Sequence, residues 1–108
     1  IPDPLWSRGL GDVYKRQGID IYNLESRATI INNKESLIVS GSLINQSNYM
    51  RIVPNIIVKI VGPDEKVIMQ EIIVLNNEYF KMNEQKPFST NFINYPKNAN
   101  KVLIEIIP

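Results

Sequence analysis

Cysteine and histidine are both absent from this chain of 108 residues. The chain therefore has no thiol nucleophile, no cysteine or histidine ligand for zinc, and no Ser-His or Cys-His catalytic pair. Disulfide bonds are also excluded, although a lack of cysteine fits both reducing and oxidising compartments. These absences remove the commonest routes to catalysis, and we expect neither an enzyme nor a cofactor or metal site.

The first 17 residues are treated separately, because foreign segments must be recognised before a fold is inferred. Residues 7–17 (SRGLGDVYKRQ) back-translate, with permitted codons throughout, to a sequence that resembles a sequencing-library adapter ending in a transposon end. Residues 1–3 nearly match the adapter's next upstream segment, and residues 4–6 fit the variable index between them. We therefore expect residues 1–17 to be non-native and disordered, and residues 18–108 to be the native domain of a metagenomic fragment.

Charge gives no sign of a nucleic-acid or membrane-surface partner. Without Arg8, Lys15 and Arg16 the twelve basic residues become nine, and without Asp3 and Asp12 the eleven acidic residues also become nine. The native part is then formally neutral, so no attraction to nucleic acid or to an anionic bilayer is expected. A basic nucleic-acid-binding arm within residues 1–17 is the weaker interpretation, since the adapter explains the same residues.

The native part consists of short apolar runs, rich in β-branched residues, that are separated by turn residues at spacings of about 8 to 12 positions. No segment has the periodicity of a helix, and no connection is long enough to hold one. We predict strands over residues 19–24, 28–31, 37–45, 55–61, 67–75, 79–82, 88–93 and 101–107. The pattern favours one all-β domain, an antiparallel immunoglobulin-like β-sandwich of about seven strands.

Two turn signals fix the expected pairing. Residues 32–35 (NNKE) form a polar turn, so 28–31 and 37–45 are expected to make a hairpin. Gly62-Pro63-Asp64 is the strongest turn signal, because proline presets φ while glycine and aspartate tolerate the remaining turn geometry. Residues 67–75 should then return antiparallel to 55–61, the expected central core strand.

Two polar or small residues in the third predicted strand have a functional and a structural interpretation. Gly41 could allow a ligand to approach, but a bulge or a tight contact between sheets is favoured. Asn45 could belong to a binding loop. Its place at a strand end before Gln46 and Ser47 favours side-chain hydrogen bonds that shape the turn.

Other candidate site residues lie in or beside turns. The acidic residues Asp20, Asp64, Glu65 and Glu84 lack the spacing of a calcium loop, which favours solvated carboxylates over a metal site or acid–base chemistry.

The loop over residues 46–51 contains the only cluster of apolar and cationic residues that is expected to be exposed. Its members are Tyr49, Met50 and Arg51, which are residue types enriched at protein interfaces. They are candidates for an interaction surface, and an ordinary loop is the alternative.

The order of these features resembles a known family. The resembling elements are 37–41, 43–47, Pro54 entering 56–60, the 62–64 turn, Phe92, and Tyr95-Pro96 with Ala99 before the last strand. They are similar to the immunoglobulin-like domain of unknown function at the C-terminal end of proteobacterial membrane proteins, which carry an N-terminal zinc ribbon and a single membrane span. FxLYD-type sandwich domains are the second choice. Pro54, Phe92 and Pro96 are expected to be structural.

The resemblance implies that a missing N-terminal region would anchor the protein in the membrane, with this domain on the periplasmic face. Three functions stay open at this stage. The first is an extracytoplasmic interaction or accessory module with an unknown protein partner. The second is a structural spacer, and the third is a fragment of an enzyme's accessory domain. A large apolar patch around Tyr49 and Met50 would favour the first, and an evenly polar surface the second.

Overall fold

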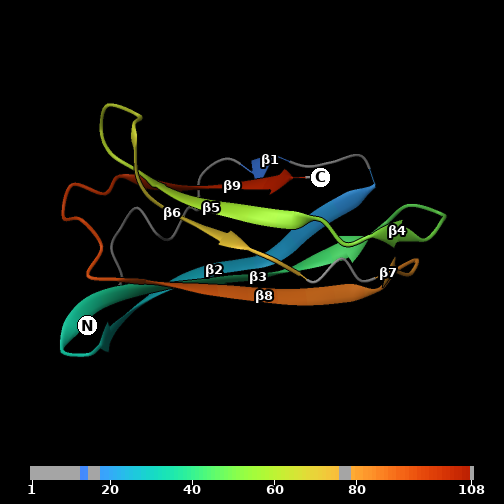
Figure 1. Ribbon diagram of the computed structural model, residues 1–108, viewed down its shortest axis with the longest axis horizontal. Helices are drawn as coiled ribbons and strands as arrows, with labels where there is room; N and C mark the ends of the chain where they lie inside the picture. The colour runs from blue at the N-terminus through green and yellow to red at the C-terminus, as the bar shows by residue number, and fades with distance from the viewer. Residues whose placement is uncertain (1–12, 15–17, 76–78, 108) are drawn as a thin grey trace.

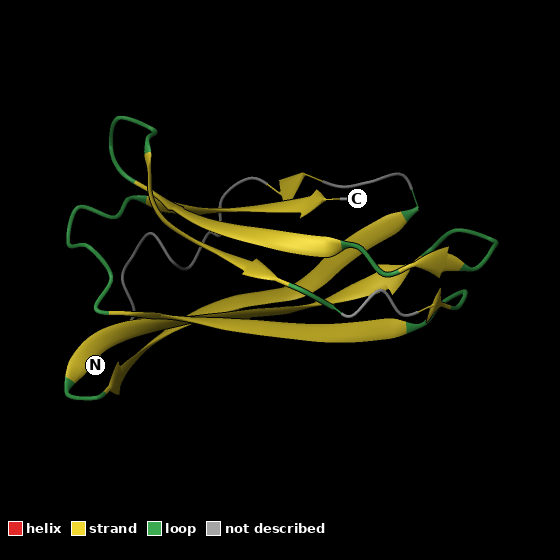
Figure 2. Ribbon diagram, in the orientation of Figure 1, coloured by secondary structure: helices red, strands yellow, loops and turns green. Residues whose placement is uncertain are grey.

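Two β-sheets face each other in the computed structural model, which describes residues 13–14, 18–75 and 79–107 (Figure 1). Within these residues there are strands and connecting loops but no helix (Figure 2). The strands are β1 (Val13–Tyr14), β2 (Ile19–Ile31), β3 (Lys34–Asn45), β4 (Arg51–Ile52), β5 (Asn55–Val61), β6 (Val67–Ile73), β7 (Tyr79–Phe80), β8 (Gln85–Ile93) and β9 (Lys101–Ile107). The predicted fold class, an all-β antiparallel sandwich, is confirmed.

One layer contains the sheet β2-β3-β8. The expected hairpin is present, and Ile31 pairs with Lys34 across a two-residue turn at Asn32 and Asn33. Both asparagines have positive φ, of 52° and 62°, which is what a type I′ turn requires. A turn of this type matches the right-handed twist of the two strands that it joins.

The predicted break between residues 24 and 28 is wrong, because β2 continues through it. Glu25 and Arg27 are exposed polar residues, which an edge strand accepts on its solvent face. The irregularity is a bulge instead: Tyr22 pairs with Ser42 and Glu25 with Ser40, which leaves two residues of β2 opposite Gly41.

The other layer contains the sheet β1-β9-β5-β6, in which β5 is an inner strand with a partner on each side. β5 pairs antiparallel with β6 on one side and with β9 on the other. The chain crosses between the layers from β1 to β2, from β3 to β5, from β6 to β8 and from β8 to β9. β9 thereby lies beside β5 and not beside β8, which is the kind of crossed connection found in immunoglobulin-like sandwiches.

The core fills the space between the layers, because apolar side chains alternate inward along the strands. In β5 and β9 every second residue is buried, while Lys59 and Glu105 lie on the outer face and form a 2.9 Å ion pair. The fully buried side chains with the largest volumes are Phe80, Phe92, Leu37, Leu43, Ile56, Ile60 and Ile104.

Several predicted boundaries need correction. β6 ends at Ile73 and not at residue 75, and β7 ends at Phe80 and not at residue 82. β8 begins at Gln85, three residues before the predicted start, and includes Pro87. An edge strand tolerates proline, because a missing backbone N–H on the outer side costs no ladder bond. The turn predicted at residues 76–78 lies outside the described residues.

Two residues of the segment expected to be foreign form a short strand. β1 pairs in parallel with β9, with Val13 opposite Ile104 and Tyr14 opposite Glu105. Residues 1–12 and 15–17 lie outside the described part.

Candidate interaction surface

One end of the sandwich is held together by a buried asparagine. Asn45 ends β3 and is fully buried, although its side chain is polar. Its backbone N–H donates to Glu84 O at 3.2 Å, and its backbone carbonyl accepts from Asn83 N at 2.7 Å. These two bonds join the end of β3 to the turn between β7 and β8.

The Asn45 side chain fixes two further segments. Its Nδ2 donates to Tyr49 O at 3.0 Å and to Phe80 O at 2.8 Å, and its Oδ1 accepts from Ser47 N at 3.0 Å. A buried amide whose donors and acceptor are all used stabilises one arrangement of the chain around it. Asn45 therefore positions both the loop after β3 and strand β7.

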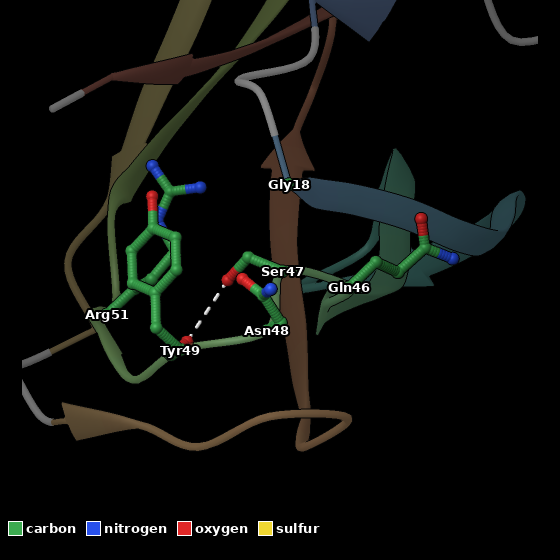
Figure 3. A pocket seen from close by; sticks show the side chains of 6 residues that line it. All are labelled: Gly18, Gln46, Ser47, Asn48, Tyr49 and Arg51. Atoms are coloured by element: carbon green, nitrogen blue, oxygen red, sulfur yellow. Dashed lines mark hydrogen bonds between the residues drawn. The ribbon is translucent and has the colours of Figure 1, made fainter.

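A shallow hollow of about 470 Å³ lies beside this loop (Figure 3). Most of its lining is polar, and it is formed by Gly18, Gln46, Ser47, Asn48, Tyr49 and Arg51. The Arg51 guanidinium carbon lies 5.6 Å from the centre of the Tyr49 ring, within cation–π range. Gly18 has a φ of +83°, and a Cβ there would lie 2.7 Å from Arg51 Nη1. Only glycine fits this position without displacing the arginine.

Large apolar side chains in residues 49–52 and 79–82 are exposed to solvent. We call this group the end patch; it comprises Tyr49 (58% exposed), Met50 (53%), Ile52 (61%), Tyr79 (70%) and Met82 (56%). They come from the two chain segments that Asn45 joins. Five of the ten large apolar side chains exposed in the described residues therefore belong to one short region of the molecule.

The short β4–β7 pair displays part of the end patch. Ile52 lies opposite Tyr79, and Arg51 lies opposite Phe80. Phe80 points into the core and is fully buried, so its neighbour Tyr79 faces outward. Outward positions of such a pair are normally polar, whereas here they hold an isoleucine and a tyrosine.

Two of the three predicted interaction residues, Tyr49 and Met50, are exposed and belong to the end patch. Arg51 is only half-buried and begins β4, so it is a strand residue and not a loop residue. Sequence reasoning missed Ile52, Tyr79 and Met82, because Ile52 and Tyr79 become neighbours only through a pairing between distant segments. The local signal that existed was the aromatic and methionine content of 79–82.

The predicted structural residues take several places in the fold. Gly41 lies in β3, where a Cβ would come within 2.9 Å of both Leu24 Cδ2 and Phe88 Cζ. Pro54 is buried between β4 and β5, and Phe92 is a core residue of β8. Pro96 is half-buried and accepts a hydrogen bond from Ala99 N at 3.1 Å.

The four acidic candidates are distributed over both ends of the sandwich. Asp20 lies in β2, Asp64 and Glu65 lie in the turn between β5 and β6, and Glu84 follows β7. No three carboxylates gather into a metal-binding group among the residues that the structure describes. A hydrogen bond from Lys81 N, 2.9 Å from Oε1, lowers the pKa of Glu84, and the nearby Lys86 ammonium lowers it further.

In the described residues, no helix has the length and apolar character that crossing a membrane requires. Comparisons of the chain with family models, with curated proteins and with solved structures found no match.

Proposed function

We propose that this domain is a non-catalytic interaction module that binds an apolar segment of a partner protein through the end patch. The observation that carries the proposal is the exposure of five large apolar side chains, each more than half exposed, on one end of the sandwich. Leaving such side chains in water forgoes the stabilisation that burial would give, about 1.5 to 3 kcal/mol for each. A binding role accounts for keeping them there.

The composition of the end patch supports the same function. Tyrosine and methionine are residue types enriched at protein interfaces, and tyrosine often dominates the binding energy. The stacking of Arg51 on Tyr49 holds the ring in place before a partner arrives. A preordered side chain loses less conformational entropy on binding.

A structural spacer is the second candidate function. It needs only a stable sandwich with an evenly polar surface. The exposed apolar side chains at one end favour the interaction module, because such patches mark interaction sites and a spacer does not require one.

We further propose that the module belongs to a membrane-anchored bacterial protein and faces the periplasm. The support is the resemblance of residues 37–47, 53–64 and 92–106 to the C-terminal domain of zinc-ribbon membrane proteins. The gene upstream of Gly18, recovered from adapter-trimmed reads, is expected to encode paired CxxC motifs followed by about 20 apolar residues. An enzyme domain or a cleavable signal peptide at that place would overturn this assignment.

The binding proposal is tested with random peptides displayed on phage and selected on the full chain. Selected peptides should be rich in aliphatic and aromatic residues. Their affinity is expected to fall at least about tenfold for the double variant Ile52→Ser and Tyr79→Ser. The matched control is Ile72→Ser with Val74→Ser, which removes two exposed apolar side chains in or just after β6 and should change affinity less than about twofold.

Circular dichroism spectra must first show that both double variants keep the β-sheet fold. Failure of the selection to enrich any peptide would leave the spacer as the better function. Peptides that bind the Ile52/Tyr79 variant as well as the parent chain would show that the end patch is not the binding surface.

A further inference from the structure

The outer edge of β9 is paired over only part of its length by the described residues. All seven residues of β9 pair with β5 on one side. On the other side, among the described residues, only Val13 and Tyr14 of β1 pair with it, at Ile104 and Glu105. The remaining positions of that edge carry no described strand partner.

The other edge strands carry features that discourage pairing with another chain. β2 has the bulge after Tyr22, β8 has Pro87, and β6 has a bulge at Ile68. Bulges and prolines are usual means by which sheets avoid adding strands. β9 (KVLIEII) contains no proline, no glycine and no bulge in its pairing with β5.

β1 shows that this edge accepts an extended segment. The residues that form β1 belong to the segment that resembles a translated adapter, so nothing in their origin was selected to fit β9. A foreign dipeptide in this place indicates that the edge is a general template for strand addition.

The charges of β9 are arranged symmetrically about its centre. Lys101 and Glu105 each lie two residues from Leu103, and all three side chains are on the outer face. We propose that two copies of this chain pair through β9 in antiparallel orientation, with Leu103 opposite Leu103 of the second copy. Lys101 of each copy then lies opposite Glu105 of the other, and the two sheets join into one.

In this register, the residues that face each other across the two β9 strands lie on the same face of the joined sheet. Val102 lies opposite Ile104 of the second copy, so core-facing residues stay opposite core-facing residues. A shift of the centre to Val102 or Ile104 keeps the faces but places neither charge opposite its complement. Oppositely charged residues that face each other stabilise an antiparallel pair, whereas like charges destabilise it.

The charges within each copy extend the complementarity. Lys101 Nζ lies 3.2 Å from Glu65 Oε1, and Lys59 Nζ lies 2.9 Å from Glu105 Oε1. Where β9 pairs with β9 of the second copy, these ion pairs would form a row of alternating charges on the outer face of the joined sheet. An interface made by two edge strands buries little area, so we expect a weak dimer that forms at high protein concentration.

The test measures the self-association of the full chain by sedimentation velocity over a wide concentration range. The variants are Lys101→Glu, Glu105→Lys and an equimolar mixture of the two. Each single variant places two pairs of like charges across the joint and should associate about tenfold more weakly than the parent chain. In the mixture, a copy with acidic side chains at positions 101 and 105 faces a copy with basic side chains at both, so association should return to the parent level or exceed it.

β1 competes for the same edge, so the series is repeated with Val13→Pro and Tyr14→Pro, which remove both backbone N–H groups of β1. This background should associate more strongly than the parent. Thermal unfolding of each variant shows whether it is folded. The proposal is overturned if the proline background stays monomeric at every concentration, or if the mixture associates no better than the single variants.

Discussion

The two ends of the sandwich are closed by different kinds of interaction. At the end with the β5–β6 turn, the chain reverses through local bonds: Glu65 N donates to Gly62 O, and Gly62 N donates to Lys66 O, both at 3.0 Å. At the end that holds the end patch, Asn45 Nδ2 donates to Phe80 O, 35 residues away in sequence. The β5–β6 turn closes through bonds within the turn, whereas the other end also depends on the side chain of one buried residue.

The surfaces of the two ends differ in the same way. Residues 63–66 of the β5–β6 turn are exposed, and three of these four residues are charged. The opposite end exposes Tyr49, Ile52 and Tyr79, which burial would stabilise. The end that depends on the buried side chain of Asn45 is therefore also the end with exposed apolar side chains. Binding residues often lie on loops that a rigid scaffold positions.

Removing Asn45 is expected to have the largest effect. Asn45→Ala leaves Tyr49 O, Phe80 O and Ser47 N without this partner, and it leaves a cavity at the end of β3. The free energy of unfolding should fall by about 2 to 4 kcal/mol. For a domain of this size that corresponds to a midpoint lower by roughly 10 to 20 °C in thermal unfolding followed by circular dichroism.

Hydrogen exchange sharpens this prediction. In Asn45→Ala, amide protection should fall first in residues 46–52 and 79–84, while residues 62–66 exchange as in the parent chain. Ser47→Ala is the control, because it removes a neighbouring side chain but keeps Asn45, and it should cost less than about 1 kcal/mol. Equal loss of protection at both ends would show that Asn45 supports the whole sandwich and not one end.

Much of the fold was predictable because its signals are local. Strands β5 and β9 occupy the predicted residues 55–61 and 101–107, since each is an apolar run bounded by turn residues. The break predicted in β2 failed because polar residues of an edge strand resemble a turn when read alone. β2 is an edge strand because it pairs only with β3, and no local sequence pattern indicates that pairing.

Less of the interaction surface was predictable. Tyr49 and Met50 stood out because they interrupt a polar loop. Ile52 and Tyr79 share a face only after β4 pairs with β7, and two-residue strands leave almost no pattern in a sequence. The hydrogen bonds of Asn45 were expected near Gln46 and Ser47, whereas the contact with Phe80 O depends on the closed fold.

A substitution in the β2–β3 turn tests the end of the sandwich that lies opposite the end patch (Figure 1). Asn33 has a φ of 62°, and a β-branched residue there would be strained. Asn33→Val should lower the free energy of unfolding by about 1 to 3 kcal/mol, while Asn33→Gly should raise it by a few tenths of a kcal/mol. Chemical denaturation of the full chain measures both.

Asn48→Val is the matched control, because Asn48 is also exposed but has no positive φ. It should change stability by less than about 0.5 kcal/mol. A loss as large as that of Asn33→Val would contradict the assignment of strain to the type I′ turn.

The smallest expected effect concerns Glu84, at the same end as the end patch. The hydrogen bond from Lys81 N lowers the pKa of this carboxyl in the folded chain. A group with a lowered folded pKa stabilises the fold above its unfolded pKa, and this contribution is lost as the pH falls through the folded pKa. Glu84→Gln should therefore be slightly less stable than the parent at neutral pH, and the difference should vanish in acid.

Thermal unfolding from about pH 7 to about pH 3 measures this difference. Glu71→Gln removes the same charge from an exposed position of β6 and serves as the control. If both variants lose stability equally at neutral pH, overall charge explains the effect. If only Glu84→Gln does, and only above the acid range, the carboxylate stabilises the 81–84 turn. Because Asn83 N donates to Asn45 O, that turn would then help to hold the end that carries the proposed binding surface.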